Sequence, residues 1–124
     1  MKITLIILTL WAKAAVGDEV NCLASIMHAE AQGESLEGVV AIGQTSIKKA
    51  RVENTTLCKL KGVHRLTPSK SMVEYYVSVA NHLLKHPKET ISLGSTHWDK
   101  GKPHMPGIIR RVVGRHTFYE LKNK

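Results

Sequence analysis

The segment CLASIMHAEAQGESLEGVVAIGQ, residues 22–44, has one amphipathic stretch before Gly33 and another after it. Its apolar residues recur at spacings of three and four, which is the period of a helix face. Gly33 is a helix stop signal, and Asp18 can cap the first helix. We therefore expect helices over residues 19–32 and 35–50. The expected core positions are Val20, Leu23, Ala24, Met27 and Ala31 on the first helix, and Val40, Gly43, Ile47 and Ala50 on the second.

The rest of the chain predicts a third helix and a small sheet. After a polar, irregular stretch through Leu66, Thr67-Pro68 begins a helix that Pro87 ends, since proline is tolerated in a first turn. Residues 108–113 and 116–121 are expected to pair as a hairpin among glycine- and proline-rich loops. At 124 residues the chain fits one α+β domain, mainly α, with a β element near its C-terminus. The expected inner face of the third helix is Val73, Tyr76, Val77, Ala80 and Leu84.

The first 17 residues, MKITLIILTLWAKAAVG, have the anatomy of a secretory signal. A lysine precedes a short apolar block, and small residues follow it. We expect export to the periplasm or cell wall, with a mature N-terminus near Ala15 or Asp18 and one mature domain over residues 18–124. The apolar block is shorter than the roughly 20 residues of a spanning helix, so no stable membrane association is expected after cleavage. An uncleaved anchor and a buried first helix are the alternatives.

Cys22 and Cys58 are the only cysteines. Outside the cytoplasm such a pair is usually oxidised, so export favours one intramolecular disulfide. Two buried free thiols are the alternative.

The formal net charge of +8 directs attention to polyanionic partners. Nucleic-acid binding would require clustered basic residues with interleaved aromatic side chains. Here the positive residues are scattered along the chain and the aromatic residues lie elsewhere. Nucleic acid is therefore not expected as a partner. Membrane surfaces and cell-wall polymers stay open, and a generally basic, solvated surface is the alternative to any polyanion site.

Three glutamates flank Gly33, and their positions differ. Glu30 falls beside Leu23, on the border of the apolar stripe. A carboxyl group there is partly desolvated, which favours its protonated form and suits a proton donor. Glu37 begins the second helix, where an acid complements the helix dipole, so its role is structural. The role of Glu34 is left open: it could be a second catalytic carboxylate, a helix-capping group or a solvated side chain.

Three segments together resemble the SleB-type cell wall hydrolases, the family of spore-cortex-lytic enzymes and related bacterial and phage proteins. They are EAQGE at residues 30–34, GSTHW at 94–98 and GRHTFY at 114–119. The family pattern is a helix ending in E-A-x-G-E and a second helix. A G-x-T-H-aromatic segment and a terminal G-x-H-x-F-Y segment follow. The resemblance covers roughly residues 21–120.

The resemblance implies a compact, mostly helical, lysozyme-like fold that acts on peptidoglycan glycan strands. We expect a monomer that uses no cofactor and no metal. Glu30, the first residue of the E-A-x-G-E segment, would be the catalytic acid. The substrate-binding residues would be Glu34, Thr96, His97, Trp98, His116 and Tyr119.

Two departures from the family pattern concern the wall of the cleft. Members usually carry an Asn-Arg pair near the end of the second helix, where this chain has Lys48-Lys49. Members often carry a Q-F-S-W segment after the second cysteine, and residues 58–70, CKLKGVHRLTPSK, have no counterpart to it. Part of the sugar-binding wall is therefore expected to be lost or rebuilt.

The predicted reaction is that of a lytic transglycosylase, because no second carboxylate stands out as a nucleophile. Glu53 and Asp99, the latter expected in a loop, are not convincing candidates. Glu30 would protonate the bridging oxygen between N-acetylmuramic acid and N-acetylglucosamine, and would then accept the proton of the muramic 6-hydroxyl.

Two other functions remain open. One is a zinc-dependent N-acetylmuramoyl-L-alanine amidase, with His28 and Glu30 joined by His97 or His116. The other is a catalytically inactive peptidoglycan-binding module. A separate zinc site at His82 and His86, spaced i, i+4, is disfavoured because both lie off the apolar face of their helix.

Overall fold

The computed structural model describes residues 18–67 and 69–121. Within them the chain is helical over residues 18–31, here called the N-terminal helix, and then forms two further helices. These are α2 (Leu36–Val52) and α3 (Lys70–Lys85), with the short 3-10 helix η1 (Leu57–Lys59) between them. Strands β1 (His97–Lys100), β2 (Gly107–Val113) and β3 (His116–Leu121) follow. This α+β architecture, with its sheet near the C-terminus, confirms the expected fold class.

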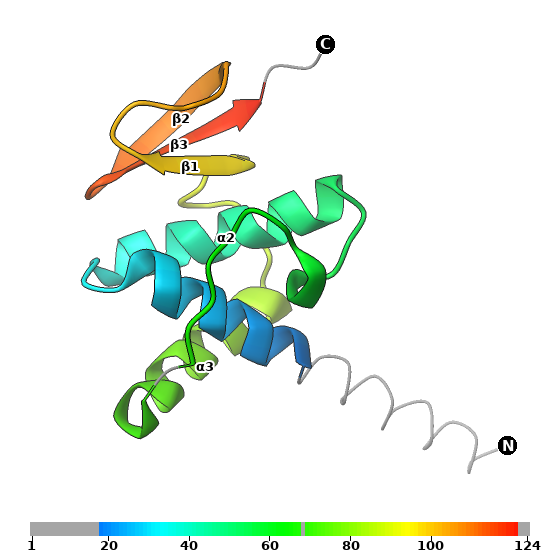
Figure 1. The fold of residues 1–124 in the computed structure, drawn as a ribbon, viewed down its shortest axis with the longest axis vertical. Coiled ribbons are helices and arrows are strands. Elements are labelled where there is room, and N and C mark those ends of the chain that lie inside the picture. Colours follow the sequence, from blue (N-terminus) through cyan, green and yellow to red (C-terminus); the bar gives the residue numbers. More distant parts are fainter. Residues whose placement is uncertain (1–17, 68, 122–124) are drawn as a thin grey trace, which may run out of the picture.

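Helix α2 is the centre of the fold. It lies between the sheet on one side and the N-terminal helix and α3 on the other (Figure 1). The Ser35 side chain accepts a hydrogen bond from the Gly38 backbone N–H and so caps the helix. Gly43 permits close packing, because a Cβ atom there would lie 2.8 Å from the Met27 sulfur.

The predicted core face of α2 included too few of the residues that the structure buries, and two of its positions are not fully buried. Val40 and Ile47 are only half-buried, whereas Gly43 and Ala50 are buried as expected. Because neighbours cover α2 on several sides, its buried positions do not follow a single stripe. The buried residues of α2 are Gly38, Val39, Ala41, Ile42, Gly43, Gln44, Thr45, Ser46 and Ala50.

Helix α3 begins after its N-cap, Ser69, slightly later than the Thr67-Pro68 pair predicted, and Pro68 lies outside the described residues. The prediction of the inner face of α3 was also partly wrong. Tyr76, Ala80 and Leu83 are buried, while Val73 is exposed. Val77 and Leu84, two other expected core positions, lie half-buried beside the core.

The hairpin predicted at residues 108–113 and 116–121 is confirmed as β2 and β3. It belongs to an antiparallel sheet of order β1-β3-β2. The central strand β3 buries four consecutive residues, His116 to Tyr119. Strand β1 pairs with β3 so that Trp98 lies opposite Phe118 and Asp99 opposite Thr117. Asp99 is therefore on a strand, which corrects its expected place in a loop.

The disulfide between Cys22 and Cys58 is confirmed, with Cα atoms 5.2 Å apart. It joins the N-terminal helix to η1. Beside it the Leu57 backbone N–H donates to the Glu19 carboxylate at 3.0 Å. The expected signal segment, residues 1–17, lies outside the described residues. None of the helices in the described part of the chain is both long enough and apolar enough to cross a bilayer.

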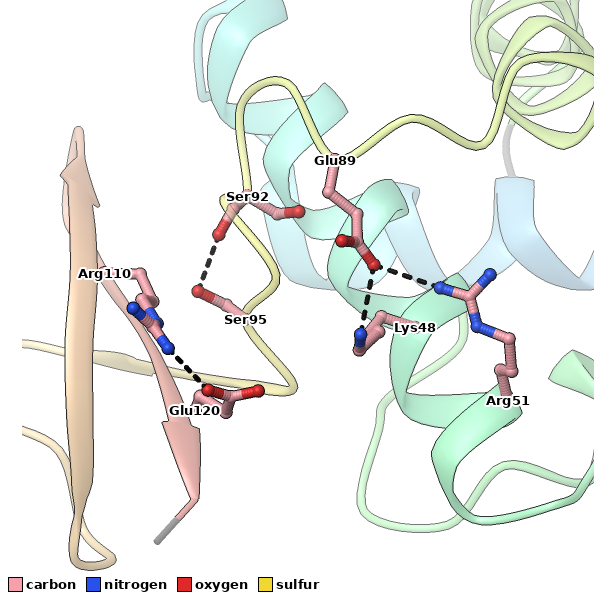
Figure 2. A network of polar contacts seen from close by, with 7 residues as sticks. All are labelled: Lys48, Arg51, Glu89, Ser92, Ser95, Arg110 and Glu120. Atoms are coloured by element: carbon pink, nitrogen blue, oxygen red, sulfur yellow. Dashed lines mark hydrogen bonds and ion pairs between the residues drawn. The ribbon is translucent and has the colours of Figure 1, made fainter.

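Polar contacts fix the segment that leads from α3 into β1. The Gln44 side-chain oxygen accepts the backbone N–H groups of Ile91 and Ser92, each at 2.9 Å. Glu89 bridges Lys48 and Arg51 of α2 at 3.5 and 3.0 Å (Figure 2). These contacts determine where β1 begins, and β1 carries part of the candidate site.

Candidate active site

A cavity of about 730 Å³ opens where the N-terminal helix, α2, β1 and β3 meet. One wall comes from residues 61–64, which run beside the N-terminal helix, because the Leu66 backbone N–H donates to the Ser25 carbonyl at 3.1 Å. The lining residues are Ala29, Glu30, Lys49, Glu53, Lys61, Gly62, Val63, His64, His97, Trp98, Asp99, Lys100, His104, Met105, His116 and Tyr119.

Glu30 projects into this cavity from the last turn of the N-terminal helix, and its side chain is 16% exposed. Its described partner is His64. The His64 backbone N–H donates to one carboxylate oxygen at 3.5 Å, and the His64 Nδ1 atom lies 3.3 Å from the other. Both contacts are long, so Glu30 is held loosely and stays open to a ligand.

The two other carboxylates of the cavity are engaged more tightly. Glu53 pairs with the Lys49 ammonium at 2.7 Å. Asp99 accepts the Tyr119 hydroxyl at 2.7 Å and the His104 backbone N–H at 2.8 Å. The His104 Nδ1 atom lies 2.8 Å from the second Asp99 oxygen.

These contacts also set the ionisation of Asp99 and Tyr119. Burial alone would raise the pKa of Asp99, but the hydrogen bonds from His104 and Tyr119 outweigh it and lower that pKa. Burial and the hydrogen bond to Asp99 raise the pKa of Tyr119 to about 12. Asp99 is thus a carboxylate and Tyr119 a neutral phenol across the physiological range.

Next to Tyr119, whose ring centroid is 5.7 Å from that of His97, Lys49 lies against His97, with their Nζ and Nε2 atoms 3.0 Å apart. The other ring nitrogen of His97 is 2.9 Å from the Thr96 hydroxyl. Burial, followed by the charge of Lys49, lowers the pKa of His97. A neutral imidazole therefore faces the cavity. Thr96 itself is buried behind the wall and does not line it.

Glu34 does not line the cavity. Its side chain is 6% exposed and pairs with the Arg115 guanidinium at 2.9 Å. Burial would raise its pKa, but the hydrogen bonds and charge of Arg115 lower it overall. His116, which does line the cavity, has its Nδ1 atom 3.6 Å from Glu34. Burial lowers the pKa of His116, although Glu34 opposes this.

The structure thus brings five of the seven expected site residues to one cavity and leaves Glu34 and Thr96 behind its wall. The five are Glu30, His97, Trp98, His116 and Tyr119. Glu37 pairs on the surface with Arg111 at 3.2 Å, away from the cavity.

Sequence reasoning did not predict the roles of Lys49, Glu53, His64, Asp99 and His104 as lining residues. The departures at Lys48-Lys49 and at residues 58–70 pointed to the wall of the cavity, and Glu53 and Asp99 were considered only as second carboxylates.

Glu30, His97 and His116 line the same cavity, but they do not converge as zinc ligands would. Within residues 18–67 and 69–121 no three His, Cys, Asp or Glu side chains form a metal-binding group. His28 instead packs against the Tyr76 ring, with centroids 5.1 Å apart. His82 and His86 face each other on α3, with ring centroids 4.8 Å apart.

Comparison with known proteins gives no match to a family model, to a curated protein or to a solved structure.

Proposed function

We propose that this protein cleaves peptidoglycan glycan strands as a lytic transglycosylase, with Glu30 as the acid and then the base. The observation that carries the proposal is the environment of Glu30. Its carboxyl group is largely shielded from solvent yet faces a cavity of about 730 Å³. A carboxyl group that faces such a cavity can come within hydrogen-bond reach of a bound glycosidic oxygen, which a general acid requires.

The cavity also suits a sugar chain. Trp98, which is half-buried, gives it aromatic surface on which the apolar face of a sugar ring can pack. The side chains of Lys61, Lys100 and His104 supply hydrogen-bond donors at the same walls. A binding site with apolar faces and a few polar groups matches an N-acetylated sugar, which has both kinds of surface.

The transglycosylase reaction uses one carboxyl group twice. The Glu30 carboxylic acid gives its proton to the oxygen that links muramic C1 to the next sugar, and the C1–O bond breaks. The resulting carboxylate takes the proton of the muramic 6-hydroxyl, and that oxygen bonds to C1. The product is a 1,6-anhydro ring, no water is consumed, and Glu30 ends protonated.

A two-carboxylate hydrolase would need a second acid as nucleophile or base. The candidates at this cavity, Glu53 and Asp99, are occupied by Lys49 and by Tyr119 and His104. Attack by the muramic 6-hydroxyl of the substrate itself requires neither of these carboxylates. We therefore favour the transglycosylase over the hydrolase.

The experiment compares the wild-type chain with Glu30→Gln on purified peptidoglycan. We expect the wild type to clear the suspension and Glu30→Gln to lose at least about 10²-fold in rate, the usual contribution of a positioned acid. Its unfolding transition should stay unchanged. Full clearing by Glu30→Gln would refute the assignment.

Cosedimentation with the same material separates the alternatives. Binding without clearing by the wild type would support the inactive module, and release of stem peptides would support the amidase.

A further inference from the structure

The Lys49 ammonium is a fixed cation on the wall of the cavity. Its side chain is only 12% exposed, and its Nζ atom lies 2.7 Å from Glu53 and 3.0 Å from His97. An ammonium group has three N–H donors. The described part of the chain supplies partners for two, so one donor remains for a ligand.

His97 positions this ammonium. Lysine can only donate, so the Nε2 atom of His97 must be the acceptor and the ring proton must be on Nδ1. That proton is donated to the Thr96 hydroxyl oxygen at 2.9 Å, and the Leu121 backbone N–H approaches the same oxygen at 3.4 Å. The Nε2 lone pair of His97 is therefore occupied, and His97 is a positioning residue for Lys49.

We propose that Lys49 binds the free lactyl carboxylate of a muramic acid residue, so that the cleft prefers strands without stem peptides. This inference rests on the proposed function. The lactyl group is a short substituent on the sugar ring, so its carboxylate can reach a cation on the wall beside that ring. Once a peptide is attached, the same carbon is a neutral amide. A carboxylate accepts a stronger hydrogen bond from an ammonium than an amide carbonyl does.

The lining of the cavity holds three lysines and three carboxylates, and the charges that favour an anionic ligand are those of the lysines without an ion pair. Lys61 and Lys100 line the same cavity, and neither has an ion pair among the described residues. Their fields add to that of Lys49. An amidase-type reaction, which hydrolyses the bond between lactyl group and peptide, would have to supply this substrate.

The test measures the affinity of the Glu30→Gln chain, which leaves the glycan uncut, for two probes. The first is a tetrasaccharide of alternating N-acetylglucosamine and N-acetylmuramic acid with free lactyl carboxylates. The second is its lactyl primary amide, which has nearly the same shape but no charge. We expect about tenfold tighter binding of the carboxylate probe, the ratio equivalent to 1.4 kcal/mol.

Adding Lys49→Met should reduce this preference to less than about twofold. Lys48→Met is the matched control, since Lys48 is the adjacent lysine but pairs with Glu89 outside the cavity, and it should keep the preference. Glu53→Gln should increase the preference, because Lys49 loses its neutralising partner. A poorly folded variant could not produce that gain.

Equal affinity for both probes, no binding of either, or a preference that survives Lys49→Met would each overturn the inference. Cleavage by the wild type is measured separately. Cleavage without a Lys49-dependent preference refutes only the inference, and a preference without cleavage refutes only the proposed reaction.

Discussion

The Glu34 carboxylate and the Arg115 guanidinium meet at 2.9 Å, joining the turn after the N-terminal helix to the turn between β2 and β3. The Arg115 backbone N–H also approaches Glu34, at 3.3 Å. His116 follows Arg115 in the chain and lines the cavity. The Glu34–Arg115 pair therefore fixes the position of the sheet relative to the helix that carries Glu30. The second glutamate of the E-A-x-G-E segment thus has a structural role.

Replacing Glu34 by Gln should therefore reduce the stability of the fold more than the rate of glycan cleavage. The loss of a buried charged acceptor costs about 1–3 kcal/mol in the free energy of unfolding. The folded-state pKa of Glu34 is lowered, so its contribution is present above the ordinary pKa of 4.5 and is lost as pH falls through the folded value. Denaturation at several pH values should show the wild type and Glu34→Gln converging in acid. A gap that stays constant below pH 4.5 would contradict this role.

Gly114, in the same turn, should tolerate no side chain. Its φ of +57° disfavours an L-residue, and a Cβ atom would overlap the Glu34 carboxylate. Gly101 is the matched control, with φ of +81° and no atom within 4 Å of the position that a Cβ atom would take. Both alanine variants should carry backbone strain of about 1 kcal/mol or more, and Gly114→Ala should lose at least about 1 kcal/mol beyond that from the overlap. Equal thermal midpoints would refute the difference.

The Cys22–Cys58 disulfide should be a major source of stability. It closes a loop with a sequence separation of 36, for which the chain-entropy relation gives about 3–4 kcal/mol. The double variant Cys22→Ser/Cys58→Ser should unfold at lower guanidinium concentration than the oxidised wild type. The reductant-treated wild type should match the variant. Identical midpoints for all three would contradict the prediction.

Much of the fold could be predicted because the signals are local. The period of apolar residues and Gly33 located the first two helices, and the glycine between residues 108–113 and 116–121 located the hairpin. The buried face of α2 could not be predicted, because it depends on three neighbours that a single-helix period does not contain. For the same reason the sequence did not predict that Leu83, rather than Leu84, is the leucine of α3 that is buried in the core.

The site was only partly predictable. Glu30 stood out because it borders an apolar stripe within its own helix. Glu53, His64 and Asp99 come from three separate segments, and only the tertiary fold brings them to one cavity. Glu34 has the same residue type as Glu30 and lies four residues further along the chain. Its burial against Arg115, 81 residues away, is invisible in a local pattern.

Adhesion to the cell wall should depend on ionic strength. The chain has a formal net charge of +8, and three lysines line the cavity. The screening length shortens from about 10 Å at 0.1 M salt to about 3 Å at 1 M. Cosedimentation of Glu30→Gln with peptidoglycan should therefore decrease steadily over that range. Binding that is independent of salt would show that the positive charges do not contribute.

The most direct test of the central claim is mass spectrometry of the glycan fragments that the wild-type chain releases from purified peptidoglycan. A lytic transglycosylase that uses Glu30 alone should leave 1,6-anhydro-muramic ends, and Glu30→Gln should release none. Fragments that carry only reducing muramic ends would contradict the account, because they require water as the nucleophile and a second group to activate it.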